Sequence, residues 1–64
     1  MAYQTTEDER RVIDWLRSQA EGFDATAQEA LKKGDRQSAR DRFGGKVTCL
    51  RAATAIELGE HRND

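Results

Sequence analysis

The 64-residue chain contains no proline, one cysteine, one histidine and few aromatic residues. A single cysteine excludes a disulfide within this chain, and one cysteine with one histidine leaves too few ligands for a structural zinc site. A domain of this length buries only about 60% of the surface that its unfolded form exposes. Small domains without disulfides or metals commonly gain stability by oligomerisation. The sequence therefore predicts self-association.

Long apolar runs are also absent, so we expect no membrane contact. No segment has the pattern of a signal peptide, and a lone thiol suits a reducing compartment, which predicts a cytoplasmic protein. The net charge of −1 argues against a protein that coats duplex DNA through bulk electrostatics. Residues 1–31 carry three basic against seven acidic side chains, whereas residues 36–58 carry five against two. The two halves are expected to attract each other.

Start and stop signals divide the chain into two helices. Thr6 and Glu9 have the spacing of a capping box, Gly34 suits a left-handed helix end, and Asp35 is a good N-cap for the segment that follows. We expect an all-α fold with one helical-hairpin domain over residues 1–64. It comprises a helix at about 6–33, a turn at 34–35, a helix at about 36–58 and a polar tail at 59–64.

Each helix carries an apolar stripe at spacings of three and four residues. The first stripe is Ile13, Leu16, Ala20, Phe23, Ala27 and Ala30, and the second is Ala39, Phe43, Val47, Leu50, Thr54 and Leu58. Because a two-residue turn reverses the chain, these stripes are predicted to pack against each other in an antiparallel hairpin.

Further small and apolar residues follow a second face of each helix. They are Gly45, Cys49, Ala52 and Ile56 in the second helix and Trp15, Ser18, Gly22 and Ala25 in the first. We expect copies of the hairpin to pair over these faces as a homo-oligomeric bundle, a dimeric four-helix bundle or a higher assembly. The predicted interface residues are Trp15, Gly22, Gly45, Cys49, Ala52 and Ile56. The alternative is that small outward residues are simply good helix formers.

The residue types give little basis for catalysis. The only histidine lies in the terminal tail, and Cys49 on a stripe of small residues is typical of a packed apolar group. The segment Gly44-Gly45-Lys46 lacks the preceding strand and the Ser or Thr of a phosphate-binding loop. We expect no enzymatic activity, no cofactor and no metal.

Glycines within the predicted helices need an explanation, because each costs about 1 kcal/mol relative to alanine. Folding about the turn brings Gly22, Ala25, Gly44 and Gly45 to one level. The glycines either let helices of neighbouring subunits approach closely or leave the floor of a groove for an anionic ligand. The candidate ligand-binding residues are Arg40, Arg42, Gly44, Gly45, Lys46, Arg51 and Trp15. The competing interpretation pairs the basic residues with acids of the first helix, such as Glu21, Asp24 and Glu29.

The chain resembles two groups of helical proteins. The alternation of alanine with leucine or phenylalanine over residues 6–58, around Gly34-Asp35, resembles Rop-like plasmid proteins, which bind RNA as antiparallel dimers. Residues 14–17 and 55–62 are similar to segments of small helical-hairpin accessory proteins of phages and prophages. This second resemblance implies action by binding, either to inhibit host defence proteins or to sequester nucleotide immune signals at subunit interfaces.

Three functions follow as hypotheses. The first is an oligomeric, phage-type, anti-defence protein that holds an anionic nucleotide between subunits. The second is an inhibitor or adaptor that binds a host protein through the helix face around Trp15. The third, less favoured, is an RNA-binding dimer that uses the basic residues of the second helix.

Overall fold

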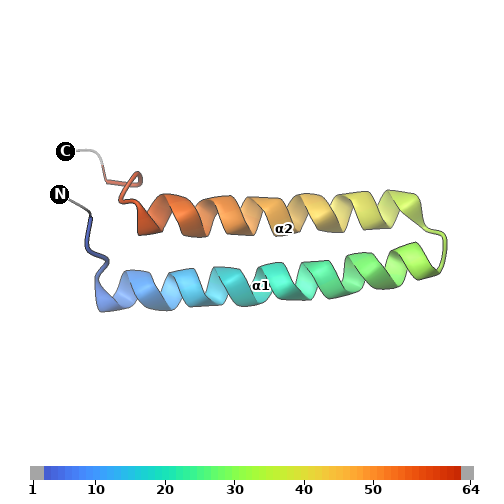
Figure 1. The fold of residues 1–64 in the computed structure, drawn as a ribbon, viewed down its shortest axis with the longest axis horizontal. Coiled ribbons are helices and arrows are strands. Elements are labelled where there is room, and N and C mark those ends of the chain that lie inside the picture. The colour runs from blue at the N-terminus through green and yellow to red at the C-terminus, as the bar shows by residue number, and fades with distance from the viewer. Residues whose placement is uncertain (1–2, 63–64) are drawn as a thin grey trace.

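The computed structural model describes residues 3–62, which form two antiparallel helices, α1 (Glu7–Lys32) and α2 (Arg36–Glu57) (Figure 1). The molecule measures 46 × 18 × 14 Å. The prediction of an all-helical hairpin is confirmed for this part of the chain. Neither helix has a stretch apolar and long enough to span a bilayer within the described residues. Residues 1, 2, 63 and 64, which the predicted domain and tail include, lie outside them.

The helix ends follow the capping signals. The Thr6 hydroxyl accepts a hydrogen bond from the Glu9 backbone N–H, and the Glu9 carboxylate accepts one from the Thr6 N–H. Gly34 takes a left-handed φ of 77°, and the Asp35 carboxylate caps α2 at the Ser38 N–H. At the far end Gly59 has a φ of 76°. The predicted bounds differ from the observed ones by one residue at three of the four helix ends.

The contact between the helices is built almost entirely from alanine. The buried residues are Ile13, Ala20, Ala27, Ala30, Ala39 and Ala53. The α1 stripe is confirmed, because its members are all buried or half-buried, with Leu16 and Phe23 at the edge of the contact. Alanine side chains let two helix axes approach closely but bury little apolar area in doing so. The core of one hairpin is therefore small.

The predicted orientation of α2 is wrong over its C-terminal half. Val47, Leu50 and Leu58 are 46%, 39% and 61% exposed, and Thr54 is also exposed. The residues that face α1 instead include Ala39, Lys46 and Ala53, which recur every seven residues. The predicted stripe advances mostly in steps of four, so at about 100° per residue it winds away from α1.

The face expected to contact another subunit is partly covered within a single hairpin. Gly45, Cys49, Ala52 and Ile56 are half-buried. A Cβ atom built on Gly45 would lie 2.9 Å from the Phe23 ring, so this glycine admits the ring. Contact of these residues with a second subunit stays a prediction. Contacts within one hairpin already account for their partial burial.

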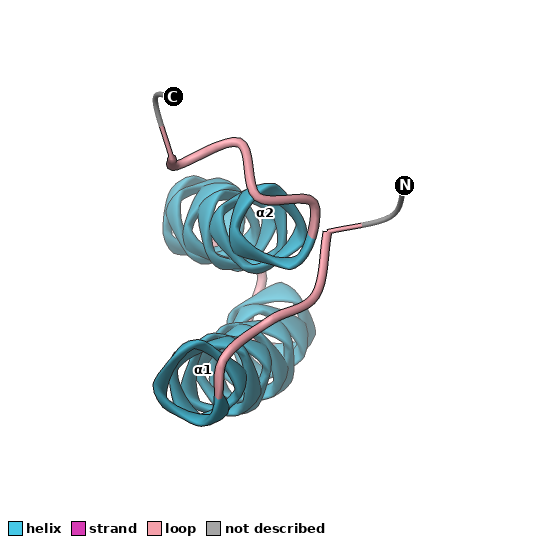
Figure 2. Ribbon diagram, turned by 90° about the vertical axis from the view of Figure 1, so that its left-hand side faces the viewer, coloured by secondary structure: helices cyan, strands magenta, loops and turns pink. Residues whose placement is uncertain are grey.

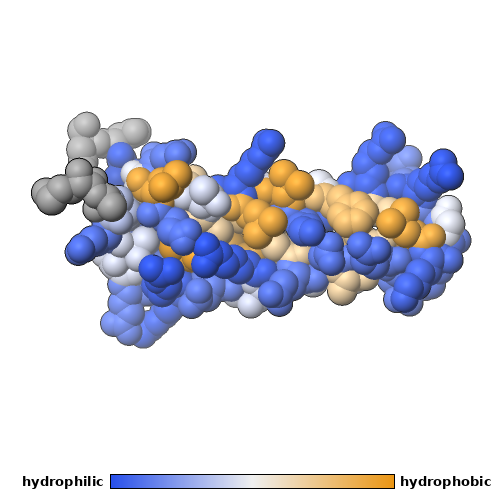
Figure 3. All heavy atoms as spheres, in the orientation of Figure 1, coloured by the Kyte–Doolittle hydropathy of each residue, from blue (hydrophilic) through white to orange (hydrophobic). Residues whose placement is uncertain are grey.

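Two ion pairs fix the level of the helices relative to each other. Lys46 Nζ lies 2.9 Å from Asp24 Oδ1, and Arg17 Nη2 lies 2.8 Å from Glu57 Oε1. The helices make a single layer, and seen end-on each has one neighbour (Figure 2). An apolar band follows α2 along the face turned to the viewer in Figure 3. The exposed Val47, Leu50 and Leu58 belong to this helix.

The two adjacent glycines of α2 are expected to respond differently to alanine. A Cβ at Gly44 meets nothing within 4 Å, so Gly44→Ala should raise the free energy of unfolding by up to about 1 kcal/mol. Gly45→Ala should lose that gain or destabilise the hairpin, because the Phe23 ring must move. Urea unfolding followed by circular dichroism measures both, and equal stabilisation by the two variants would contradict the packing of Phe23 on Gly45.

Candidate functional site

The basic residues of α2 fall into two groups. Lys46 is paired with Asp24, and Arg42 Nη1 donates a hydrogen bond to Thr26 Oγ1 at 3.4 Å. Both side chains therefore contact α1, and for Lys46 the expected pairing with Asp24 is confirmed. Arg40 and Arg51 are exposed, and within residues 3–62 no carboxylate lies within salt-bridge distance of either.

Arg51 lines a shallow groove on the outer side of α2. The groove holds about 540 Å³ and is lined by Val47, Leu50, Arg51, Thr54, Ala55 and Glu60. Its wall is mostly apolar, with one guanidinium and one carboxylate at its polar edges. This combination accepts a ligand with an anionic group and a flat apolar part.

The predicted glycine floor is not formed as expected. The Phe23 ring fills the space beside Gly45, so that glycine lines no open groove. Gly22 and Gly44 face open space, with nothing within 4 Å of a built Cβ. Gly45 thus permits close packing within one hairpin, and the predicted approach of helices from neighbouring subunits at the glycines stays a prediction. The open-groove interpretation fails at Gly45, because an aromatic side chain of α1 occupies the available volume.

Trp15 lies far along the hairpin from Arg40. Its side chain is 60% exposed on α1. The contacts of Phe23 with Gly45 and of Asp24 with Lys46 show that residue n of α1 lies near residue 68 to 70 minus n of α2. Trp15 is then level with about residue 54, on the order of 20 Å along the axis from Arg40. The structure does not join Trp15 and Arg40 in one site.

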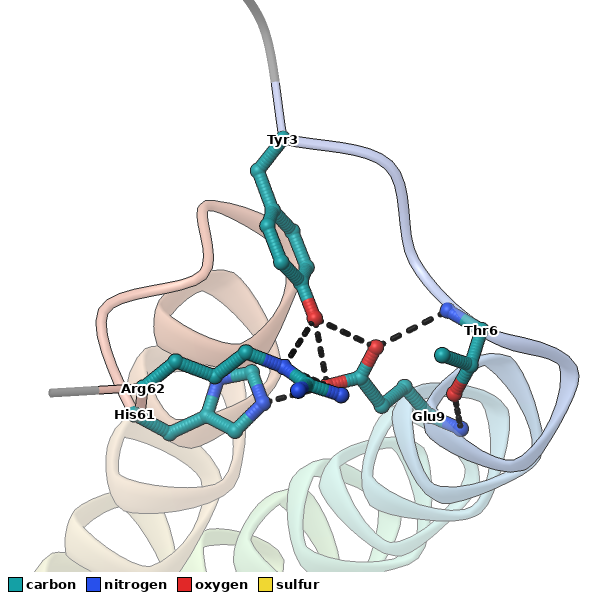
Figure 4. Close-up of polar contacts among 5 residues, drawn as sticks. All are labelled: Tyr3, Thr6, Glu9, His61 and Arg62. Atoms are coloured by element: carbon teal, nitrogen blue, oxygen red, sulfur yellow. Dashed lines mark hydrogen bonds and ion pairs between the residues drawn. The ribbon is translucent and has the colours of Figure 1, made fainter. Parts of the chain in front are cut away.

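A polar cluster closes the open end of the hairpin. Glu9 lies at its centre and is only 12% exposed, between the segment before α1 and the tail after α2 (Figure 4). The Tyr3 hydroxyl donates to the Glu9 carboxylate at 2.6 Å, and Arg62 Nε donates to the Tyr3 hydroxyl at 2.6 Å. His61 Nε2 also contacts Glu9 Oε2, and Arg62 Nη2 lies 3.2 Å from the same oxygen.

The Tyr3 ring covers the tail. The ring lies edge-on to the His61 ring, with 5.9 Å between centroids, and the Arg62 guanidinium carbon is 5.7 Å from the Tyr3 centroid. Gly59 packs beneath the same ring, since a Cβ there would lie 2.6 Å from it. The central role of Glu9 beyond its capping box was not predicted. Two of its partners, His61 and Arg62, are more than 50 residues away in sequence.

Hydrogen bonds and ion pairs to Glu9 join the two ends of the chain, and we call this cluster the Glu9 clamp. The Thr6 backbone N–H, followed by the Tyr3 hydroxyl and then His61 and Arg62, donates to the Glu9 carboxylate and holds its pKa well below the usual range. Burial and the hydrogen bond to Glu9 raise the pKa of Tyr3, so the phenol keeps its proton and remains a donor at neutral pH. Within residues 3–62 no group of three His, Cys, Asp or Glu side chains is placed to hold a metal.

Comparison of the chain with protein-family models, with curated proteins and with solved structures gives no significant match.

The clamp predicts a specific loss of stability in acid. Because the pKa of Glu9 is lower in the folded than in the unfolded chain, its contribution is complete above the ordinary value of 4.5 and declines as the pH falls below it. Wild-type protein should therefore melt at a higher temperature than Glu9→Gln at about pH 7, with the difference shrinking towards about pH 3. Thermal melts by circular dichroism across this range test it.

The matched control is Glu7→Gln, which removes an acid from the same helical turn, outside the clamp. If the difference between wild type and Glu9→Gln stays constant with pH, or if Glu7→Gln reproduces it, the clamp does not act through the charge of Glu9.

Proposed function

We propose that the protein is a small non-catalytic binding protein that works as a homo-oligomer of hairpins and holds an anionic, nucleotide-like ligand on the outer side of α2. The observation that carries this proposal is the groove in which Arg51 stands beside an apolar wall. A guanidinium offers two parallel donors to a phosphate. Val47 and Leu50 offer a surface on which a base can lie, and Glu60 accepts hydrogen bonds from a ribose or an amino group.

The free arginines support the same function. Lys46 and Arg17 each have a carboxylate partner on the other helix, and the pair of Lys46 with Asp24 joins the basic to the acidic half of the chain. Arg40 and Arg51 have none among residues 3–62. An exposed guanidinium without an internal partner is available to an external anion.

The biological setting that we propose is capture of a nucleotide immune signal by a phage-type anti-defence protein. The similarity of residues 14–17 and 55–62 to segments of phage helical-hairpin proteins supports this setting. Sequestration requires no chemistry on the ligand, and His61 is engaged in the contact with Glu9.

Nucleotide binding should depend on Arg51 and on phosphate. Native mass spectra of the purified protein, alone and with ATP or adenosine, should show added mass for ATP and none for adenosine. Arg51→Gln should weaken ATP binding by about tenfold or more, the value of a charged hydrogen bond of roughly 1.5–3 kcal/mol. Titration calorimetry gives the affinities.

The control is Arg36→Gln, which removes an exposed arginine from the first turn of α2, outside the groove. It should leave ATP affinity unchanged. Equal losses in the two arginine variants would indicate unspecific charge attraction, and a wild-type protein that adds no mass with ATP would contradict the nucleotide function.

A protein partner is a second candidate, because of one observation. Trp15 is 60% exposed on α1, although tryptophan is the residue type most enriched at the centres of protein interfaces. Ser18, Gly22 and Ala25 continue the same face and are also exposed. A flat stripe of small residues beside one indole suits the helix of a partner.

Removing the indole should separate partner binding from stability. Trp15→Ala should change the free energy of unfolding by less than about 0.5 kcal/mol, because the side chain is mostly outside the core. It should also abolish co-purification of any host protein with a tagged chain. If the same host protein co-purifies with wild type and with Trp15→Ala, the Trp15 face is not its binding site.

A further inference from the structure

We infer that the apolar stripe formed by the half-buried Phe43 and the exposed Val47, Leu50 and Thr54 of α2, with Leu58 directly after the helix, is the surface on which a second copy of this chain docks, with the two α2 helices antiparallel. The inference rests on the proposed function only in that an anion held by Arg51 would then lie between subunits, with the apolar part of the ligand at the edge of the contact, because the second copy covers Val47. The partner is a second copy of the chain in antiparallel orientation. The proposed contact lies on the flank of α2 opposite to the face predicted from the sequence, which is formed by Gly45, Cys49, Ala52 and Ile56.

The core of one hairpin is small, and the larger apolar residues of the α2 stripe remain exposed to solvent. Its buried side chains are one isoleucine and five alanines. By contrast, Val47, Leu50 and Leu58 are 39–61% exposed. Small scaffolds without disulfides or metals reach stability by oligomerisation when their own core is too small. A helix face that keeps its large apolar residues outside the core is the natural place for that contact.

The stripe has the symmetry that a two-fold contact requires. Two antiparallel copies centred between Leu50 and Arg51 place residue n level with about 101 minus n of the partner. Phe43 then lies level with Leu58 of the second copy, and Val47 with Thr54. These two pairs join an apolar residue to an apolar or small one, Leu50 lies level with Arg51 of the second copy, and the same patch serves both copies, as an isologous interface demands.

Charge decides the orientation. Arg40, Val47 and Thr54 recur every seven residues, so Arg40 lies on the flank of the stripe, and Glu60 lines the same groove as Val47. Antiparallel docking brings Arg40 level with His61 of the second copy, one residue from its Glu60, and the attraction of Arg40 to Glu60 acts at both ends. Parallel docking would set Arg40 beside its own equivalent, which is a repulsion.

The centre of this arrangement explains why the groove would bind an anion. Arg51 lies within one residue of the two-fold centre, so the two copies of this guanidinium approach each other. A bound phosphate relieves their repulsion. By linkage, a ligand that binds both guanidinium groups tightens the dimer, and the dimer in turn tightens ligand binding.

Two valines of equal exposure test the surface. Val47 on α2 and Val12 on α1 are both 46% exposed. Val47→Gln should raise the dimer dissociation constant by at least about tenfold, because each dimer loses two buried valines, whereas Val12→Gln should leave it unchanged. Sedimentation equilibrium without nucleotide gives both constants, and circular dichroism confirms that helicity is retained. A monomeric wild type, or equal weakening by the two variants, overturns the inference.

A charge exchange tests the orientation without altering the apolar face. Arg40→Glu and Glu60→Arg should each weaken the dimer several-fold, and the double variant should restore it. In one chain Arg40 lies roughly 25 Å along α2 from the end of the helix at Glu57, and Glu60 lies beyond that end, so recovery must come from contact between chains. A double variant as weak as the sum of the single variants overturns the antiparallel arrangement.

Failure of this inference and failure of the proposed function are distinguishable. A monomer that binds ATP through Arg51 keeps the function and removes the dimer. A dimer that responds to Val47→Gln but adds no mass with ATP keeps the interface and removes the nucleotide.

Discussion

The close approach of two helices along an alanine seam is the constraint on which the structure depends. Ala20, Ala27, Ala39 and Ala53 occupy the contact, and Gly45 opens a space for the Phe23 ring. Helices that meet through such small side chains leave no room for leucine or valine between them. The larger apolar residues of α2 are therefore displaced to the outer flank, where they form the exposed stripe.

Polar contacts fix the position of one helix against the other, which the small alanine core does not do alone. The pairs Asp24–Lys46 and Arg17–Glu57 bridge the helices beside the alanine seam. At the open end, Glu9 joins the start of α1 to the tail, and Tyr3 covers Gly59. Exposed ion pairs contribute little individually, so their main effect is to fix the level of one helix against the other. That level in turn determines which residues of α2 remain outside.

Local signals made most of the fold predictable. Thr6 with Glu9, and Gly34 with Asp35, act within a few residues, and the helix boundaries follow from them. The α1 stripe was also predictable, because its alternating steps of three and four keep it on one face. In α2, two stripes compete, and hydropathy favours the one with larger residues. The smaller residues face α1 because they let the two helices approach closely and because ion pairs join the helices at this rotation of α2. Neither effect can be read from the pattern of one helix alone.

The candidate site could be predicted only in part. The sequence identified Arg40 and Arg51 as ligand candidates, but which basic residues pair with α1 depends on the rotation of α2. Lys46 and Arg42 turn inward, whereas Arg40 and Arg51 remain free of partners among residues 3–62. The Glu9 clamp was not predicted, because its residues come from opposite ends of the chain. Tyr3 before the first helix, with a basic tail, was the one available signal.

The distance between two spin labels at position 37 tests the central claim, antiparallel docking through α2, most directly. Gln37 is exposed at the start of α2, and Cys49, the single cysteine, can be replaced by alanine so that a new cysteine at 37 takes the label alone. Antiparallel docking places the two labels roughly 40 Å apart along the helices, from the rise per residue. A distance distribution centred near that value supports the account. Labels found close together, or an absence of dipolar coupling at concentrations where the dimer should form, would contradict it.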